Sequence, residues 1–321
     1  MDAKPKTLQQ AIRHFSDEQV CIDTVASLRW PNGPVCPACE HKDHYYLKTQ
    51  KRWKCKECYK QFTVKLGTIF EDSPLTLDKW LCALWMLVND KNGISSYEVH
   101  RALGVTQKSA WFMLQRLRLA LKSGSIEKAG GPGGEIEVDE TFIGGKLRNM
   151  HGRRKAAWNK MRGSVGKAVV MGILDRDKGQ VRAKVVPDAK RPTLHGEIRE
   201  NVHAGTNVYT DEAVAYRDMS PDYLHQFCTH INKYVDGRVH TNGLENFWSL
   251  LKRGLNGTYI AVEPFHLSRY VDEQVFRYNN RGTKDKKFTD ADRFELALSQ
   301  VAGKRLTFAE VTGKVGGSPA F

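Results

Sequence analysis

Residues 133–146, GGEIEVDETFIGGK, alternate apolar and polar side chains and end in a pair of glycines before a lysine. In the strand that this alternation predicts, Ile136 and Val138 point to one face and Asp139 points to the other. Because aspartate is disfavoured within strands, Asp139 is either exposed at a sheet edge or required for a function. The stretch therefore predicts the first strand of a sheet, with a candidate functional acid on it.

More strands and helices follow this first strand. We expect strands at 167–176 (KAVVMGILDR), 181–188 (VRAKVVPD), 206–211 and near 226–231, a helix at about 190–202, and further helices toward the C-terminus. Three strands in series, followed by alternating helix and strand, predict a mixed α/β domain.

Two further acids lie in contexts that would bring them to Asp139. Asp211 lies at the end of a strand in NVYTDEAVAY (207–216), and Glu245 lies in HTNGLENFWSLLKRGL (240–255), which predicts the opening turns of a helix. Each acid has a simpler alternative. Asp211 could be a turn or helix-start residue, and Glu245, three residues after Asn242, could be the capping acid of its helix.

Three convergent carboxylates repel one another unless cations lie between them, so we expect two Mg²⁺ ions at this site. Two ions can activate an attacking oxygen and stabilise the leaving oxygen of a phosphodiester. Lys252, seven residues after Glu245, would lie on the same helical face and bind the DNA backbone. Asn246 and Arg253 continue this helix, and we expect them at the DNA as well.

The composition favours a polyanionic partner. The 321 residues include 50 Lys and Arg against 36 Asp and Glu, a net charge of +14, which predicts salt-dependent binding to nucleic acid. The longest apolar run, 81–88, is too short to span a bilayer, and the N-terminus has no apolar segment typical of a secretory signal. Two close pairs among the seven cysteines indicate metal binding in a reducing cytoplasm rather than disulfides.

The two cysteine pairs predict a zinc ribbon. Cys36 and Cys39 form one CxxC pair, Cys55 and Cys58 form the other, and 15 residues separate the pairs. Four thiolates at this spacing can enclose one structural Zn²⁺, which would supply much of the folding free energy of so small a segment. Lysines and histidines around the pairs fit DNA contact, although a structural or protein-binding role is the alternative. We expect the remaining cysteines to be packing residues; they are Cys21, Cys82 and Cys228.

A helix-turn-helix is expected within residues 74–122. LTLDKWLCALWMLVN (75–89) has a helical apolar stripe, SSYEVHRALG (95–104) is capped at its start by Ser95 or Ser96 and stopped by Gly104, and the next helix has Thr106 as its N-cap. In this interpretation the last helix would bind DNA through residues near its start and farther along. These residues are Gln107, Lys108, Ser109 and Arg116. The alternative is a helical bundle that connects two domains.

A basic segment at 146–167 contains eight Lys or Arg and no acid. Beside a metal site it could hold a phosphate backbone, with an aromatic ring available for base stacking; a solvated loop is the alternative. The residues expected to contact DNA here are Arg153, Arg154, Lys155 and Trp158.

At these motifs the chain resembles bacterial insertion-sequence transposases of the DDE type with a catalytic domain called ISXO-like. VDETFIGGK (138–146) is similar to the family's first-Asp motif, YTDE (209–212) to its second, and HTNGLENFWSLLKRGLNGTY (240–259) to its Glu-Asn motif. RYVDEQVFRYNNR (269–281) resembles the family's next helix. The resemblance implies an RNase H-like fold and two Mg²⁺ or Mn²⁺ ions. It also implies that Asp139, Asp211 and Glu245 are the catalytic metal ligands.

We therefore expect a transposase that binds the terminal inverted repeats of an insertion sequence and cuts and joins DNA. It would act on double-stranded transposon ends and target DNA in the bacterial cytoplasm, at the nucleoid, as a homo-oligomer and without an organic cofactor. The alternatives are an RNase H-like hydrolytic nuclease and a zinc-ribbon regulator with an inactive catalytic domain. The expected segments are 1–31 (helical), 32–66 (zinc ribbon), 74–122 (helix-turn-helix), 123–134 (linker), 135–295 (catalytic domain) and 296–321 (tail).

Overall fold

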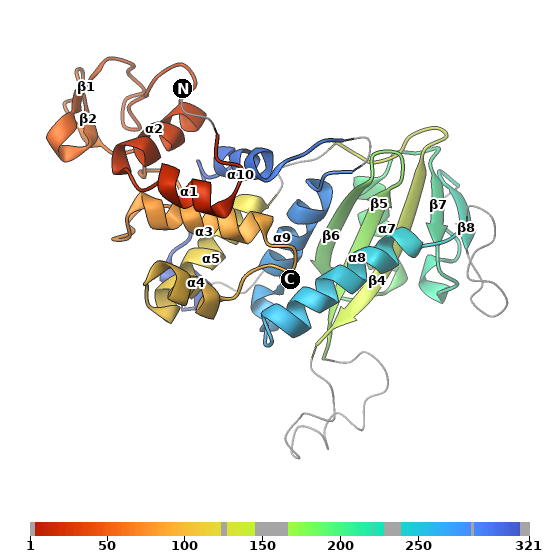
Figure 1. The fold of residues 1–321 in the computed structure, drawn as a ribbon. Coiled ribbons are helices and arrows are strands. Elements are labelled where there is room, and N and C mark those ends of the chain that lie inside the picture. The colour runs from red at the N-terminus through yellow and green to blue at the C-terminus, as the bar shows by residue number, and fades with distance from the viewer. Residues whose placement is uncertain are drawn as a thin grey trace. The chain divides into compact units, whose positions relative to one another are not determined.

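The chain divides into two units, which are described separately. The computed structural model describes residues 4–122, 127–144, 166–219, 221–227, 239–283 and 286–314. The first unit comprises Met1–Lys122 with Asn280–Ser318, and the second comprises Ser123–Asn279 with Pro319–Phe321 (Figure 1). Across these described ranges, no helix is long and apolar enough to cross a membrane.

The first unit begins with two short helices. In α1 (Leu8–His14) and α2 (Glu18–Arg29), the side chains of Thr7 and Asp17 accept hydrogen bonds from first-turn backbone N–H groups. The sequence predicted a helical segment over residues 1–31. It forms two helices because the Asp17 cap starts a new helix directly after the buried Phe15.

A three-stranded antiparallel sheet follows. It consists of β1 (His44–Leu47), β2 (Arg52–Cys55) and β3 (Gln61–Phe62), with the 3-10 turn η1 (Lys48–Gln50) between the first two strands. Trp53 stacks on Phe62 with ring centroids 5.9 Å apart, and Trp30 packs edge-on against both rings. This aromatic cluster is small, so a bound metal ion would add to the stability of the sheet.

Helix α3 (Leu77–Asn89) is buried along most of its length at the centre of the first unit. It packs against α1, α2, α5 and α10 (Asp290–Ser299). Phe294 of α10 lies 5.4 Å from the Phe15 ring and 5.3 Å from the Trp85 ring. Through these contacts α10 joins the first unit, although the sequence analysis grouped residues up to 295 with the α/β domain. The short α11 (Phe308–Val311) packs on α5.

A tight turn joins α4 (Ser96–Leu103) to α5 (Gln107–Leu121). Ser95 and Glu98 form a reciprocal capping box at the start of α4. Of the two predicted caps, Ser95 and Ser96, the helix therefore uses Ser95. Gly104 ends the helix in the left-handed conformation with φ 61°, and Thr106 caps α5. The predicted order of helix, turn and helix is therefore present.

The second unit is built on a five-stranded mixed sheet with the order β6-β5-β4-β7-β8. Strands β4 (Glu135–Ile143), β5 (Ala168–Asp175) and β6 (Gln180–Val186) are antiparallel, whereas β7 (Asn207–Thr210) and β8 (Leu224–Phe227) run parallel to β4. The predicted mixed α/β architecture is confirmed. The last strand begins two residues before the expected 226, and residues 228–231 of that prediction lie outside the described part of the chain.

Alternate residues of the central strands face two separate cores. Ile136 and Val138 pack with α7 (Arg191–Asn201) and the 3-10 turn η3 (Val214–Tyr216) on one face. On the other face, β5 and β6 pack with α8 (Asn242–Arg253) and α9 (Leu267–Asn279). A π-helical turn, η4 (Gly254–Thr258), and a 3-10 turn, η5 (Pro264–His266), connect these two helices.

The predicted linker is attached to the second unit from Ala129 onward. Ala129 donates to the Asn201 carbonyl at 2.8 Å, and Gly131 donates to Thr206 Oγ1 at 2.9 Å. A Cβ atom at Gly130 would lie 2.6 Å from the Thr206 side chain, so this close approach requires glycine. The glycines therefore serve packing as well as flexibility.

Two exposed glycines should respond oppositely to alanine substitution. Gly104 has a left-handed backbone and Gly196 lies within α7, and a Cβ atom at either position would meet nothing within 4 Å. We expect Gly104→Ala to lower the free energy of unfolding by about 1 kcal/mol and Gly196→Ala to raise it by up to about 1 kcal/mol. Urea unfolding of the two variants checks the signs, and a stabilised Gly104→Ala protein would contradict the turn conformation.

Candidate active site and metal centre

Parallel pairing of β4 with β7 brings two of the predicted acids to one level of the sheet. Glu137 pairs with Tyr209 in this ladder. Asp139 lies two residues beyond that pair on β4, and Asp211 lies two residues beyond it on the neighbouring segment, directly after the last residue of β7. The charge of Asp211 acts on the Asp139 carboxyl. The structure therefore brings these two acids together from positions more than sixty residues apart in the sequence.

Burial dominates the electrostatics of Asp139 and raises the pKa of its carboxyl to about 7. A hydrogen bond from Trp248 opposes this rise, whereas the charges of Glu140 and Asp211 add to it. A half-buried carboxylate beside two other acids is unfavourable unless a proton or a cation neutralises it. Oxygen donors in such a setting suit a hard divalent cation, so the residues present fit Mg²⁺ or Mn²⁺.

Helix α8 packs on the sheet next to Asp139. Trp248 Nε1 donates to Asp139 Oδ2 at 2.8 Å. Gly172 lies opposite Asp139 on β5, and a Cβ atom there would lie 2.7 Å from the indole ring. Glycine at this position therefore leaves the space that the indole fills.

Buried Glu137 holds the first turn of the same helix. Its Oε2 accepts a hydrogen bond from the Leu244 backbone N–H at 3.0 Å, and its Oε1 accepts one from Arg176 Nε at 2.8 Å. Arg176 also donates to the His240 carbonyl at 2.6 Å. Because Thr241 makes no side-chain cap, Glu137 supplies the negative group at this helix N-terminus. The sequence analysis did not single out Glu137, since its partner is 107 residues away.

Glu245 is exposed in the first turns of α8. The helix begins at Asn242 and the Glu245 N–H donates to the Thr241 carbonyl at 3.0 Å, so the alternative pairing of Glu245 with Asn242 as a cap is not formed. Trp248 is three residues further, on the adjacent helical face. Among the described residues, only a cysteine group brings three or more potential ligand atoms within 4.8 Å of one another. Asp139, Asp211 and Glu245 therefore do not form such a group among the described residues, although the charge of Asp211 acts on Asp139.

A fourth carboxylate, Glu140, lies next to this pair. It accepts a hydrogen bond from the hydroxyl of the buried Tyr216. Burial raises the pKa of Glu140; the Tyr216 hydrogen bond opposes this effect and the Asp211 charge adds to it. The sequence analysis selected Asp139 and not Glu140. Because successive side chains in a strand point to opposite faces, these two acids lie on opposite faces of β4.

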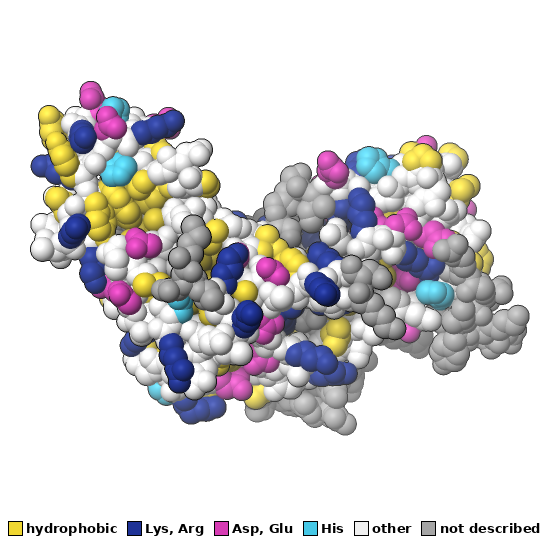
Figure 2. All heavy atoms as spheres, turned by 45° about the horizontal axis from the view of Figure 1, so that its top comes forward, with side chains coloured by type: hydrophobic (Ala, Val, Ile, Leu, Met, Phe, Trp, Pro, Cys, Tyr) yellow, Lys and Arg dark blue, Asp and Glu magenta, His cyan; other side chains and the backbone are white. Residues whose placement is uncertain are grey.

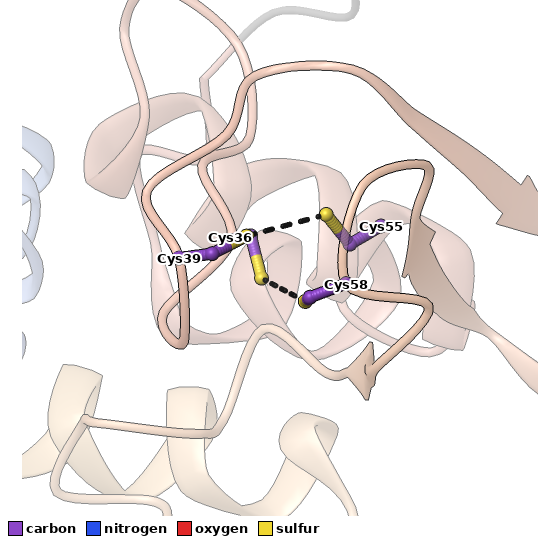
Figure 3. Close-up of side chains that lie close together, drawn as sticks. All are labelled: Cys36, Cys39, Cys55 and Cys58. Atoms are coloured by element: carbon purple, nitrogen blue, oxygen red, sulfur yellow. Dashed lines mark hydrogen bonds between the residues drawn. The ribbon is translucent and has the colours of Figure 1, made fainter.

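The four cysteines of the ribbon form the expected metal site (Figure 3). Their sulfur atoms all lie within 4.8 Å of one another, and the Cys36–Cys58 and Cys39–Cys55 sulfur pairs are each 3.6 Å apart. A tetrahedral zinc with bonds of about 2.3 Å would place its sulfur ligands about 3.8 Å apart. The spacing therefore fits a structural zinc ion.

The ribbon thiols hydrogen-bond to one another, and their pKa values shift in opposite directions. A backbone hydrogen bond from His41 lowers the pKa of Cys39, but hydrogen bonds to the other thiols raise it to about 12, whereas the pKa values of Cys36 and Cys55 are lowered. Burial disfavours the Cys36 thiolate, but backbone N–H groups of Ala38 and Cys39 outweigh this effect and lower its pKa to about 7.

Burial raises the pKa of Cys21 to about 12 and that of Cys82 to about 11, as expected for packing residues. Cys228 lies outside the described residues.

The predicted DNA contact at Arg116 is not supported, because this residue is buried in the helical unit. Its guanidinium donates to the Glu71 carbonyl and lies over the rings of Trp80 and Phe112. Most of α5 is buried in the same way. The body of this helix therefore matches the alternative interpretation, a helical bundle.

Residues at the start of α5 make contacts within the first unit. Gln107 donates to Ser96 Oγ, and Ser109 contacts the Thr106 hydroxyl. Lys108 is exposed and its ammonium lies 4.8 Å from the centroid of the Phe308 ring. Of the predicted base-reading set, Lys108 is thus the exposed member.

The other predicted DNA contacts fall into two groups. Asn246, Lys252 and Arg253 are exposed on α8. They remain available to a ligand. Arg153, Arg154, Lys155 and Trp158 lie outside the described residues.

Positive side chains are spread over the surface. On the face shown in Figure 2, the Lys and Arg side chains of the described residues are interspersed with Asp and Glu. The densest basic run in the sequence, 146–167, lies almost entirely outside the described part. Net charge alone therefore does not locate a DNA path.

The two structural parts correspond to two known domain families. Residues 132–279 match the family model of the ISXO2-like transposase domain, and residues 16–61 match that of the transposase zinc-ribbon domain. Residues 132–279 thus form an ISXO2-like transposase domain, and residues 16–61 form a transposase zinc-ribbon domain. The resemblance that the sequence motifs indicated is thereby confirmed.

A relative from Halobacterium salinarum agrees with this placement. It is described as an uncharacterized protein in transposable element ISH50 and is 26% identical to this chain over 272 residues, which cover 81% of this chain and 90% of the relative. The cryoEM structure of the simian T-cell lymphotropic virus intasome in complex with PP2A regulatory subunit B56 gamma is similar at 15% identity. That match covers 67% of this chain and 74% of the other, with a TM-score of 0.31.

Zinc binding should depend on the ribbon cysteines alone. We expect the purified protein to hold one zinc ion per chain, Cys55→Ser to lose it, and Cys82→Ser to retain it, because Cys55 belongs to the sulfur cluster and Cys82 does not. Atomic emission after gel filtration measures the ratio. A full equivalent of zinc in Cys55→Ser would contradict the site.

The raised pKa of Asp139 predicts a pH dependence of stability. The folded carboxyl has a pKa of about 7, above its unfolded value near 3.9, so the folded state binds the proton more tightly. Its stabilising effect is complete below about pH 4 and is lost as the pH rises through 7. Without added divalent metal, wild type should lose up to about 1.4 kcal/mol per pH unit relative to Asp139→Asn in this window.

Urea unfolding of both proteins at several pH values from 4 to 8 measures this difference. Parallel pH profiles would show that burial does not raise the Asp139 pKa.

Proposed function

We propose that the second unit is an RNase H-like domain that cleaves the 3′ ends of an insertion sequence and transfers them into target DNA. Its sheet has three antiparallel strands followed by two strands parallel to the first, which supports the RNase H-like assignment. The observation that carries the proposal is the side-by-side placement of Asp139 and Asp211 beneath the helix that bears Glu245.

In this proposal Asp139, Asp211 and Glu245 hold two Mg²⁺ or Mn²⁺ ions. When bound, such ions activate the attacking oxygen and stabilise the leaving oxygen of a phosphodiester. Water would attack first at the element end, and the freed 3′-OH would then attack the target strand.

The protein's own groups orient this chemistry. Trp248 holds the Asp139 carboxylate, and Glu137 holds the helix that carries Glu245. Lys252 and Arg253 are exposed at the end of that helix, where they would bind the phosphate backbone and offset developing negative charge. The site thus has candidate ligands, a support for one ligand and cations for the substrate.

The first unit would recognise the double-stranded DNA of the terminal inverted repeats. The ribbon exposes two tyrosines, each beside a lysine: Lys56 lies 5.0 Å from the Tyr45 ring and Lys54 lies 5.8 Å from the Tyr59 ring. Lys108 at the start of α5 adds a further exposed cation. Because two ends must be joined together, we propose that the DNA-bound protein is a homo-oligomer.

A strand-transfer assay tests the proposal. A plasmid with the element's own ends around a marker would be incubated with the protein, Mg²⁺ and a target plasmid, and marker–target junctions would be sequenced. We expect junctions with wild type, and at least a 100-fold loss with Asp139→Asn and Glu245→Gln, because each removes a ligand charge.

Both variants should still bind the DNA ends in a gel-shift assay. Glu200→Gln changes an exposed acid on α7, on the opposite face of the sheet, and should leave joining unchanged. Nicked DNA without junctions would instead identify a hydrolytic nuclease, and end binding without cleavage would identify a DNA-binding protein.

A further inference from the structure

The indole of Trp248 makes a polar contact with the Asp139 carboxylate. Trp248 Nε1 lies 2.8 Å from Asp139 Oδ2, and the indole is only 4% exposed. An indole N–H donates but cannot accept a hydrogen bond, take up a proton at neutral pH or ligate a cation. Its only polar role toward a carboxylate is therefore to occupy one oxygen and fix the plane of the group.

The surrounding residues hold the indole in this position. Gly172 faces Asp139 across the β4–β5 ladder, and a Cβ atom there would lie 2.7 and 2.8 Å from two indole carbons. Phe247 packs against the indole with ring centroids 5.1 Å apart. A side chain at residue 172 would thus push the donor away from Asp139 without altering either partner.

We propose that Trp248 is a positioning residue for the metal site: it holds Oδ2 of Asp139 and leaves Oδ1 to bind the metal beside Asp211. The inference rests on the proposed function, because it takes Asp139 as a metal ligand. It also couples the ligands, since the donor lies one helical turn after Glu245 on the same helix. Movement of α8 would therefore change the orientation of Asp139 and the position of Glu245 together.

Loss of this hydrogen bond should weaken metal binding without removing a ligand. Groups that orient metal ligands typically change metal affinity by about 10- to 100-fold. Trp248→Phe keeps an aromatic ring and removes the donor, whereas Gly172→Ala keeps the donor and displaces it. We expect both variants to bind Mn²⁺ about 10-fold more weakly or worse.

The test measures Mn²⁺ binding to the DNA-free, zinc-loaded full chain by electron paramagnetic resonance, with melting temperatures recorded beside it. Trp85→Phe is the matched control, because Trp85 is equally buried but lies in the first unit against Phe294. It should bind Mn²⁺ like wild type. In the strand-transfer assay, excess Mn²⁺ should restore joining by Trp248→Phe but not by Asp139→Asn.

Two results would overturn the inference, and they are distinguishable. If Trp248→Phe binds Mn²⁺ as tightly as wild type while Asp139→Asn does not bind it, the positioning role fails and the proposed metal site stands. If wild type and Asp139→Asn bind Mn²⁺ equally, the metal site fails as well. A normal melting temperature with weakened Mn²⁺ binding in Trp248→Phe supports the positioning role over a general packing effect.

Discussion

The parallel pairing of β4 with β7 is the constraint on which the candidate site depends. Asp139 and Asp211 come at corresponding positions of the two segments only because Glu137 pairs with Tyr209, two residues before each of them. A slip of one residue would turn Asp139 to the opposite face of the sheet. The register is fixed by Ile136 and Val138, which are fully buried in the core beneath α7. The apolar side of β4 thus determines where its acidic side lies.

Two hydrogen bonds join helix α8 to β4, and their spacing along the helix matches their spacing along the strand. Glu137 binds the backbone of Leu244, and Asp139 binds the side chain of Trp248. Residues two apart in a strand are roughly 6.8 Å apart, and residues four apart in a helix rise by about 6 Å. The two hydrogen bonds can therefore form together only when the helix lies nearly along the strand. This geometry sets the path of the helix that carries Glu245.

Part of the protein's positive charge is used inside the first unit. Arg116 is buried between aromatic rings and a backbone carbonyl, and Lys65 donates to the carbonyls of Ser73 and Leu75. Burial lowers the pKa of both groups. A helical pattern predicts that Arg116 lies on a helix, but it does not show whether its side chain faces solvent. The net charge of the sequence therefore overstates the cations that are free to meet DNA.

The sequence by itself determined the features that depend on near neighbours in the chain. The CxxC spacing, the caps at Ser95 and Thr106, the stop at Gly104 and the alternating strand around Asp139 all follow from such short-range rules. The order of the expected strands and helices predicted the mixed α/β domain. Only the tertiary structure decided which side chains separated in sequence come into contact.

The tertiary structure placed Glu137 at the start of α8 and brought Trp248 to Asp139 in the space left by Gly172. It also buried Arg116 and packed α10 in the first unit. These outcomes depend on packing between elements, because a side chain's partner across a sheet or bundle is set by register and volume. Neither quantity is encoded in local spacing.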